Sequence, residues 1–503
     1  MMNGGCMPDV KFPENSIIPS IKEYSTVADA SLSLNKLTTI YISNENQIPD
    51  LESKLAVFIE EFKLLTGKAL TLTYDKPVEQ AGCIIVEINS ENASGYFDEH
   101  YIDVMPDELR IASPTVSGIF FATRTVLQFA QRTGTIPVGN IHDYSLVKER
   151  GLLLDVARKY FPVAWVKKLI EHMAALKLNV LQLHLSDNEG FRLETSVDKD
   201  KYGVDFETPS VLTKNDILEI IQYAKERCIS VIPEFDSPGH MANIIDKLQE
   251  HDADKYNDIS SGILTKNNLN IKSALAKQIV SDIINEWADA FEGCPDFHLG
   301  GDEFYVSLLP LIFGITHDDA VTYLNELSDQ VIRKGMKPRV WNDEIFRDGW
   351  SVEPNKNGVI CYWSATIGFA INGQVIHLDH YAPVMDFISR GYQVVNANQN
   401  YLYYSHGNYQ PKPQEIYTEW TPLVFAGKNE GIDAQQVIDD LSQVVGALYC
   451  VWCDGGDSLE EDIIYQDIKL AIRSMSEKSW ASDTANDYSL FTALSDDWEP
   501  IHL

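Results

Sequence analysis

Two adjacent carboxylates, Asp302 and Glu303, follow a short apolar stretch and two glycines, a pattern that predicts the end of a buried strand. Acids placed side by side at such a point are costly to desolvate, and structure alone seldom requires them. Neighbours on a strand point to opposite faces, so both acids can reach one ligand only where the strand relaxes into its loop. Gly300 and Gly301 let a ligand approach the backbone closely. The pattern predicts that Asp302 and Glu303 are the reactive centre of an enzyme.

The elements that must position these acids form a regular alternation of strands and helices after residue 148. Short apolar segments alternate with segments of helical periodicity. Eight such units predict a (β/α)8 TIM barrel with loop insertions, whereas the alternative, a doubly wound open sheet, rarely contains so many. The predicted barrel strands are 151–157, 178–186, 229–235, 296–301, 339–341, 359–363, 393–397 and 447–452.

The segment before the barrel predicts a smaller domain of its own. Between about residues 30 and 145, short strands of β-branched and aromatic residues mix with two segments of helical periodicity, 51–65 and 115–131. We therefore predict an α/β chain with an N-terminal α+β domain at 1–147 and a catalytic barrel with a C-terminal helix at 148–503. No helix is expected between 343 and 358, so the fifth barrel unit is predicted to be degenerate.

Acids, histidines and aromatic residues follow almost every predicted barrel strand. In this fold the carboxyl ends of the strands form the active site. Carboxylates among tryptophans and tyrosines suit sugars, whose apolar faces stack on rings while their hydroxyls bond to acids. In an ordinary retaining glycosidase two acids from separate strands lie about 5–5.5 Å apart. An adjacent pair is better suited to dividing two tasks around one sugar. The strand-end residues include His184, Asp187, Asp236, His240, Trp341, Trp363, Tyr401, Tyr403, Trp452 and Asp454.

Composition excludes several function classes. The net charge of −34 disfavours nucleic acid and anionic membranes as partners, because both would repel the chain. No stretch approaches the roughly 20 apolar residues of a membrane span, so no membrane insertion is expected. The first residues lack the basic and apolar regions of a secretory signal. This favours a cytoplasmic location, with secretion through an export signal absent from this chain as the alternative.

Neither cysteines nor histidines predict a metal site. Seven cysteines are an odd and sparse set for 503 residues, which argues against a disulfide framework. Cys450 and Cys453 match C-x-x-C, but they belong to a predicted strand, on which positions three apart face opposite ways. No His-x-His or His-x-x-x-His pair supports a metal-dependent hydrolase. We expect no metal and no cofactor.

Four motifs, taken in order, resemble glycoside hydrolase family 20, the β-N-acetylhexosaminidases and lacto-N-biosidases. They are RGLLLD at 150–155, NVLQLHLSD at 179–187, PEFDSPGH at 233–240 and HLGGDE at 298–303. The resemblance covers about residues 30–480, including the small α+β domain. It implies a retaining exo-enzyme that removes terminal β-linked N-acetylglucosamine, or N-acetylgalactosamine, from oligosaccharides or glycoconjugates. A non-catalytic glycan-binding homologue is the alternative class, and such a protein would be expected to lack Glu303.

The resemblance also implies substrate-assisted catalysis, in which the 2-acetamido group of the sugar replaces a protein nucleophile. Glu303 is implied to be the general acid and then the base, with a pKa raised by the neighbouring carboxylate and an aromatic enclosure. Asp302 is implied to bind the acetamido N–H and Tyr401 the acetamido oxygen, while an oxazolinium ion forms. The other implied substrate-binding residues are Arg150 at the ring hydroxyls, Asp187, Asp236 and His240 as rim or orienting groups, Trp341, Trp363 and Trp420 as acetamido-pocket walls, Trp452 as the stacking surface and Asp454 at the far hydroxyls.

Two positions depart from the commonest pattern of the family. Many members have Tyr-x-Asp after the seventh strand, where this chain has Tyr401-Leu402-Tyr403. After the tryptophan of the eighth strand it has Asp454 where Glu is more usual. Both positions are implied to touch the far hydroxyls of the bound sugar. The departures leave open a lacto-N-biosidase, which releases a disaccharide, as the alternative activity.

Overall fold

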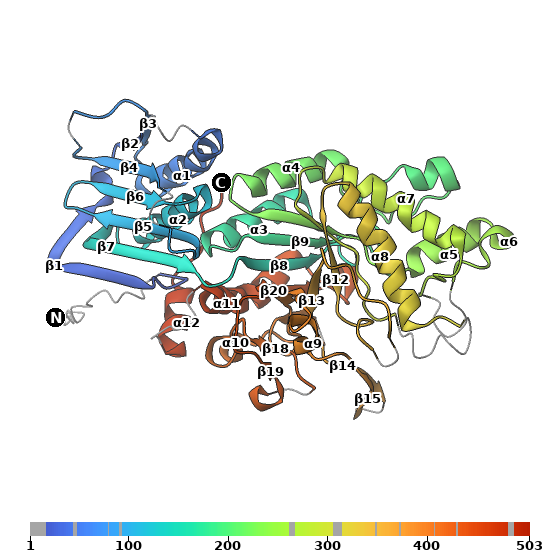
Figure 1. The fold of residues 1–503 in the computed structure, drawn as a ribbon. Coiled ribbons are helices and arrows are strands. Elements are labelled where there is room, and N and C mark those ends of the chain that lie inside the picture. Colours follow the sequence, from blue (N-terminus) through green and yellow to red (C-terminus); the bar gives the residue numbers. More distant parts are fainter. Residues whose placement is uncertain are drawn as a thin grey trace, which may run out of the picture. The chain divides into compact units, whose positions relative to one another are not determined.

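The computed structural model describes two compact units (Figure 1). The first comprises Met1–Leu146, Ala175–Lys177 and Ser476–Leu503, and the second comprises Val147–Ala174 and Leu178–Met475. The described residues are 17–43, 48–78, 80–89, 93–260, 267–304, 314–347, 350–371, 374–406, 408–428, 431–480 and 487–503.

The first unit is a seven-stranded sheet with two main helices. The strand order is β1-β7-β5-β6-β4-β2-β3, with antiparallel pairs on the β1 side and parallel pairs on the β3 side. The helix α2 begins at Val116, and the side chain of the preceding Thr115 accepts a hydrogen bond from the Gly118 N–H and so caps the first turn. The elements are β1 (Glu23–Ser33), β2 (Thr39–Ile42), α1 (Pro49–Thr66), β3 (Thr71–Thr73), β4 (Cys83–Ile88), β5 (Phe97–Val104), β6 (Leu109–Ser113), α2 (Val116–Arg132), β7 (Thr135–Ser145) and α12 (Tyr488–Asp496).

The second unit contains a closed barrel of eight parallel strands. Neighbouring strands pair in the order β8-β9-β10-β11-β12-β13-β16-β20, and β20 pairs with β8 to close the ring. The strands are buried on both faces, as expected where helices surround a parallel sheet. The predicted (β/α)8 barrel is confirmed. Its strands are β8 (Glu149–Asp155), β9 (Val180–His184), β10 (Ser230–Glu234), β11 (Asp296–His298), β12 (Lys337–Trp341), β13 (Val359–Tyr362), β16 (Gln393–Asn396) and β20 (Val444–Trp452).

Helices and short strands fill the connections between the barrel strands. Between β12 and β13, described residues 342–347 and 350–358 contain no helix, in agreement with a degenerate fifth unit. The short strand β17 (Tyr403–Ser405) pairs with the end of β20 and so extends the barrel edge at the site. The other elements are α3 (Val163–Ala175), α4 (Lys214–Lys225), α5 (Ala242–His251), α6 (Ala253–Tyr256), α7 (Ala274–Ala290), α8 (His317–Arg333), β14 (Thr366–Ile371), β15 (Gln374–His380), α9 (Val384–Ile388), α10 (Pro413–Thr418), β18 (Val424–Phe425), β19 (Gln436–Val437) and α11 (Glu461–Trp480).

The division of the chain differs from the sequence prediction at the C-terminus. The prediction placed all of 148–503 in the barrel domain, whereas Ser476–Leu503 belongs to the first unit. Within that unit, Trp498 donates its indole N–H to Gln131 at 2.8 Å, and Arg132 donates to the Leu494 carbonyl at 3.0 Å. These contacts join residues more than 360 positions apart, so the helical periodicity of the C-terminal segment could not predict which unit it belongs to.

Candidate active site

A cavity of about 140 Å³ opens at the carboxyl ends of the barrel strands. It holds carboxylates, two histidines, an arginine and aromatic rings, the residue types expected there from the sequence. It is lined by Arg158, His184, Asp187, His240, Asp302, Glu303, Trp363, Tyr403, Ser405, Tyr409, Trp452 and Asp454.

The turn after β11 presents Asp302 and Glu303 to this cavity. Gly300 and Gly301 have φ values of 71° and 100°, in the region that favours glycine. A Cβ atom on Gly300 would lie 1.9 Å from Oδ1 of Asp236, so the backbone can pass there only as glycine. The same Asp236 oxygen accepts a hydrogen bond from the Gly301 N–H at 3.3 Å. Asp236 is buried and acts on the turn, one layer behind the cavity.

Glu303 is fixed by its backbone. Its φ of 51° is unusual for a residue with a side chain, and its N–H donates to Oδ2 of Asp343 at 2.8 Å. The other Asp343 oxygen accepts the indole N–H of Trp363. One buried carboxylate therefore sets both the acid-bearing turn and an aromatic wall of the cavity.

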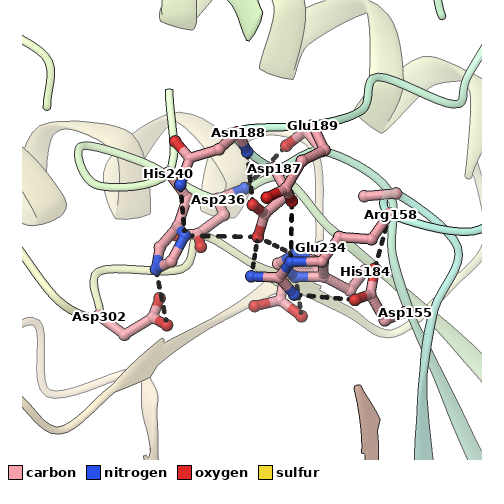
Figure 2. A network of polar contacts seen from close by, with 12 residues as sticks. Asp155, Arg158, His184, Asp187, Asn188, Glu189, Glu234, Asp236, His240 and Asp302 are labelled. Carbon is pink, nitrogen blue, oxygen red and sulfur yellow. Dashed lines mark hydrogen bonds and ion pairs between the residues drawn. The ribbon is translucent and has the colours of Figure 1, made fainter. Parts of the chain in front are cut away.

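His240 lies between the two acids and a second charged layer. Its Nε2 is 3.6 Å from Oδ2 of Asp302 and 3.4 Å from Oε2 of Glu303. Its Nδ1 is 3.4 Å from Oδ2 of Asp187, which in turn contacts Nε2 of His184 at 3.0 Å and a guanidinium nitrogen of Arg158 at 2.7 Å. Figure 2 shows this run of contacts from Asp302 through His240 and Asp187. Negative and positive groups alternate along it.

This arrangement shifts the pKa values of the two acids in opposite directions. Burial raises the pKa of Glu303, but the His240 hydrogen bond and charge and the Arg158 charge outweigh it, so the pKa is lowered. The expected rise of the Glu303 pKa is therefore wrong. The pKa of Asp302 is raised, by burial and then by the charges of Glu234 and Glu303, against the opposing charge of His240. Burial lowers the pKa of His240, but Asp187 and Glu303 raise it well above its usual value.

Aromatic rings form the remaining walls. Trp363 and Tyr403 are nearly parallel, with ring centroids 6.0 Å apart and an interplanar angle of 8°. Trp452 lies against Tyr403 at 5.9 Å, and its ring meets the edge of His184 at 5.1 Å. Trp341 is buried beneath this layer, 6.3 Å from Trp452. The structure thus brings Trp363 and Trp452 to the cavity and places Trp341 under its floor.

Trp420 and Tyr401 lie outside the cavity lining. Trp420 is fully buried just after α10, and its backbone N–H donates to the Glu415 carbonyl. Tyr401 is buried too, and its hydroxyl donates to Oε2 of Glu419 at 2.9 Å. Tyr401, predicted to reach the substrate, does not line the cavity, whereas Tyr403, two residues further along, does.

The register of β17 explains this correction. Tyr403 and Ser405 pair with Cys450 and Trp452 of β20 and face the cavity together, because alternate strand residues share a face. The position two residues after the pocket tyrosine is therefore Ser405. Its hydroxyl donates to Oδ2 of Asp454, which is half-exposed at the rim. Asp454 lies at the cavity, as predicted from the sequence.

Arg150 is corrected to Arg158. Arg150 is the second residue of β8, and its guanidinium donates to the Val147 carbonyl at 3.0 Å, at the amino end of the barrel. Arg158 follows the carboxyl end of the same strand and lines the cavity. Its guanidinium contacts Asp155 at 2.8 Å and Asp187 at 2.7 Å. The sequence could have distinguished the two arginines. The active site of a TIM barrel forms from residues at the carboxyl ends of the strands, and Arg158 lies there whereas Arg150 does not.

Two sets of side chains hold their ligand atoms close enough for a metal ion, His184, Asp187 and Asp236 in one and Asp236, His240 and Asp302 in the other. Each set includes a histidine whose pKa is raised well above its usual value. A metal ion would have to displace the proton of these histidines, which their neighbouring carboxylates stabilise. We assign no metal site to them.

A barrel whose strand ends carry an acid pair and aromatic walls has the architecture of a glycoside hydrolase. Residues 148–466 match the model of "Glycosyl hydrolase family 20, catalytic domain", and residues 14–144 match "Glycosyl hydrolase family 20, domain 2". The chain belongs to glycosyl hydrolase family 20.

Similar proteins agree with this assignment. The chain is 26% identical over 435 residues to a lacto-N-biosidase of Bifidobacterium bifidum, covering 83% of this chain and 35% of that protein. It is 24% identical over 498 residues to the β-hexosaminidase subunit beta of Entamoeba histolytica, covering 91% and 82%. A β-N-acetylhexosaminidase structure from Bacteroides fragilis superposes with a TM-score of 0.71 at 20% identity, over 95% of this chain and 93% of that one, which supports the fold. None of the helices in the described ranges is long and apolar enough to cross a membrane.

Proposed function

We propose that the protein is a retaining exo-β-N-acetylhexosaminidase that removes terminal, non-reducing β-linked N-acetylglucosamine, or N-acetylgalactosamine, from oligosaccharides or glycoconjugates. The observation that carries the proposal is the adjacent pair Asp302 and Glu303 in one aromatic-walled cavity, with His240 within 3.6 Å of both carboxylates. Two acids on one turn lie on the same side of a bound sugar. They suit catalysis in which the substrate supplies the nucleophile.

In the first step the glycosidic bond breaks as the acetamido oxygen bonds to the anomeric carbon. Glu303 gives its proton to the departing oxygen, so the leaving sugar departs as a neutral alcohol. Asp302 accepts the acetamido N–H and stabilises the positive charge of the resulting oxazolinium ion. In the second step water attacks the anomeric carbon, and Glu303 takes the proton of that water. Two inversions at one carbon give net retention.

The cavity walls match the parts of such a substrate. Trp363, Tyr403 and Trp452 offer ring faces and a hydroxyl for the acetamido group and the apolar sugar face. Arg158, which lies over the Trp452 ring, and Asp454 at the rim offer a donor and an acceptor for ring hydroxyls. The substrate class is therefore a 2-acetamido sugar.

The test of the acid is Glu303→Gln, with Glu419→Gln as the matched control outside the cavity. Glu303→Gln should lower turnover of a natural disaccharide by roughly 10²–10⁴-fold, the usual contribution of a general acid. The loss should be smaller with an activated phenolate leaving group, which needs little protonation. Glu419→Gln should retain the wild-type rate. A wild-type rate in Glu303→Gln on the disaccharide would refute the assignment, and failure of an oxazoline-mimicking thiazoline to inhibit the wild type would refute substrate assistance.

A lacto-N-biosidase is the second candidate, favoured by the rim of the cavity. Ser405 stands where an acid follows the pocket tyrosine in many members of the family, and its hydroxyl is turned to Asp454. A smaller residue there leaves more room beside the far hydroxyls for a substituted sugar. Hydrolysis of a chromogenic β-N-acetylglucosaminide beside the same reporter on lacto-N-biose separates the two activities. Release from the second substrate alone would replace the exo-hexosaminidase proposal.

A further inference from the structure

Glu234, the last residue of β10, is a fully buried carboxylate below the cavity. Four side chains from three strands approach its two oxygens. Oε1 accepts the indole N–H of Trp341 at 2.8 Å and lies 3.2 Å from Nδ1 of His298. Oε2 accepts the Gln182 amide at 2.8 Å and lies 3.2 Å from Nδ1 of His184. A charge enclosed in this way is costly unless its partners hold it in the ionised form.

The partners do hold Glu234 ionised. Burial raises its pKa, but the charges and hydrogen bonds of His298 and His184 outweigh it, so the pKa lies well below the usual value. The same contacts act on His184: burial lowers its pKa, and Glu234 and Asp187 raise it well above the usual value. Glu234 and His184 therefore each favour the charged form of the other.

The two oxygens lead to two different parts of the site. Oε1 accepts the hydrogen bond of Trp341, and the Trp341 ring packs beneath Trp452 at the cavity floor. Oε2 lies beside His184, whose other ring nitrogen contacts Asp187 at 3.0 Å. Asp187 in turn contacts His240, which lies beside both acids of the pair. We propose that Glu234 is a positioning residue, which couples the floor of the acetamido pocket to the electrostatics of the acid pair. This inference rests on the proposed function for the identity of the pocket.

The charge of Glu234 also acts on Asp302 over a longer range. It raises the pKa of Asp302 more strongly than the charge of His184 lowers it. Loss of the Glu234 charge, even together with the His184 proton, should therefore lower the pKa of Asp302. The groups that face Glu234 from the surrounding strands are Gln182 and His184 on β9, His298 on β11, Trp341 on β12, Cys361 on β13 and Cys450 on β20; those around Asp302 are His240, Glu303, Asp236 and Asp343.

The first test compares Glu234→Gln with Glu149→Gln. Glu149 is a partly buried barrel carboxylate, paired through both oxygens with Arg339 at 2.8 Å at the amino end of the barrel, away from the cavity. Glu234→Gln should lower kcat/KM by up to about 10²-fold, the usual effect of a small misplacement of binding groups. The acidic limb of the kcat/KM–pH profile of Glu234→Gln should also move to lower pH. Glu149→Gln should lose stability while keeping the wild-type pH profile. An unmoved acidic limb in folded Glu234→Gln would overturn the coupling.

The second test is a double-mutant cycle with Trp341→Phe, which keeps a ring but removes the N–H bound to Oε1. If Glu234 positions the pocket floor through that N–H, Trp341→Phe should lower kcat/KM clearly in the wild type and little in Glu234→Gln. Fold-changes that simply multiply would show that the two residues act independently and would overturn the inference.

A titration separates failure of this inference from failure of the proposed function. Carboxyl carbon NMR of Asp302 follows its ionisation without any substrate. A lower pKa in Glu234→Gln than in the wild type supports the coupling even if the wild type cleaves no N-acetylglucosaminide. An equal or higher pKa contradicts it even if the enzyme is fully active.

Discussion

Replacement of Arg158 by lysine tests the placement of the cationic group more sharply than any other change. The guanidinium contacts Asp155 at 2.8 Å and Asp187 at 2.7 Å, and its Nε lies 3.1 Å from Glu189 and 3.7 Å from Asp454. Contacts with described residues engage three nitrogens, and a guanidinium carries five N–H groups, so two remain for a substrate hydroxyl. Lysine keeps the charge but replaces this fork by a single ammonium.

The magnitude follows from those contacts. An ammonium can satisfy one of the buried acids, Asp155 or Asp187, but it cannot hold both and also face the cavity. The lost charge-assisted hydrogen bond is worth about 1.5–3 kcal/mol. If that bond acts in the transition state, kcat/KM should fall about 10- to 150-fold, at about 1.4 kcal/mol for each factor of ten. The assay is kcat/KM on a chromogenic β-N-acetylglucosaminide, with the urea midpoint measured in parallel.

Arg150→Lys is the matched control. Arg150 is also buried, but it bonds to backbone carbonyls at the amino end of its strand. We expect Arg150→Lys to lower the urea midpoint while leaving kcat/KM of the folded fraction close to wild type. If Arg150→Lys loses as much catalytic efficiency as Arg158→Lys, the reasoning from strand ends is wrong.

The remaining predictions concern the protonation of the acid pair. His240→Asn should move the acidic limb of kcat/KM to higher pH, because the His240 charge lowers the pKa of both Asp302 and Glu303; a limb that stays or moves lower would contradict this. In the wild type the kcat profile should extend beyond the kcat/KM profile at both limbs, because bound substrate favours an ionised Asp302 and a protonated Glu303. Coincident profiles would show that binding does not redistribute the proton.

Much of the fold was predictable because the barrel is built from local periodicity. Eight buried parallel strands leave eight apolar runs in the sequence, and the helices between them carry their own period. The long strands β1 and β7 escaped prediction. β7 contains Pro137, Gly139 and Asn140, residues depleted in strands, and it is stabilised by pairing with both β1 and β5. Tertiary pairing outweighed local preference there.

The candidate site was predictable in its residue types and less so in its register. Arg150 lies near the amino end of β8 and Arg158 follows its carboxyl end. Only the direction of the strand relative to the cavity shows which of the two arginines lines it. Tyr401 and Tyr403 differ by two positions, yet the short strand β17 begins at the second. The first tyrosine is drawn instead to Glu419 in a loop that no pattern in the sequence connects to it. Resemblance to a motif locates a segment, whereas side-chain direction is decided by the backbone within it.

The opposite pKa shifts of two neighbouring residues show what a linear motif cannot contain. Desolvation alone would raise the pKa of both Asp302 and Glu303, although the Glu303 side chain is the more exposed of the two. The difference comes from groups distant in sequence. Glu303 faces His240 and Arg158, and their charges prevail, whereas Asp302 also feels the carboxylate of Glu234 and keeps a raised pKa. These shifts favour the protonated form of Asp302 and the ionised form of Glu303. Under the proposed mechanism the acetamido N–H binds an ionised Asp302 while Glu303 supplies a proton, so the bound sugar favours the opposite protonation of the two acids.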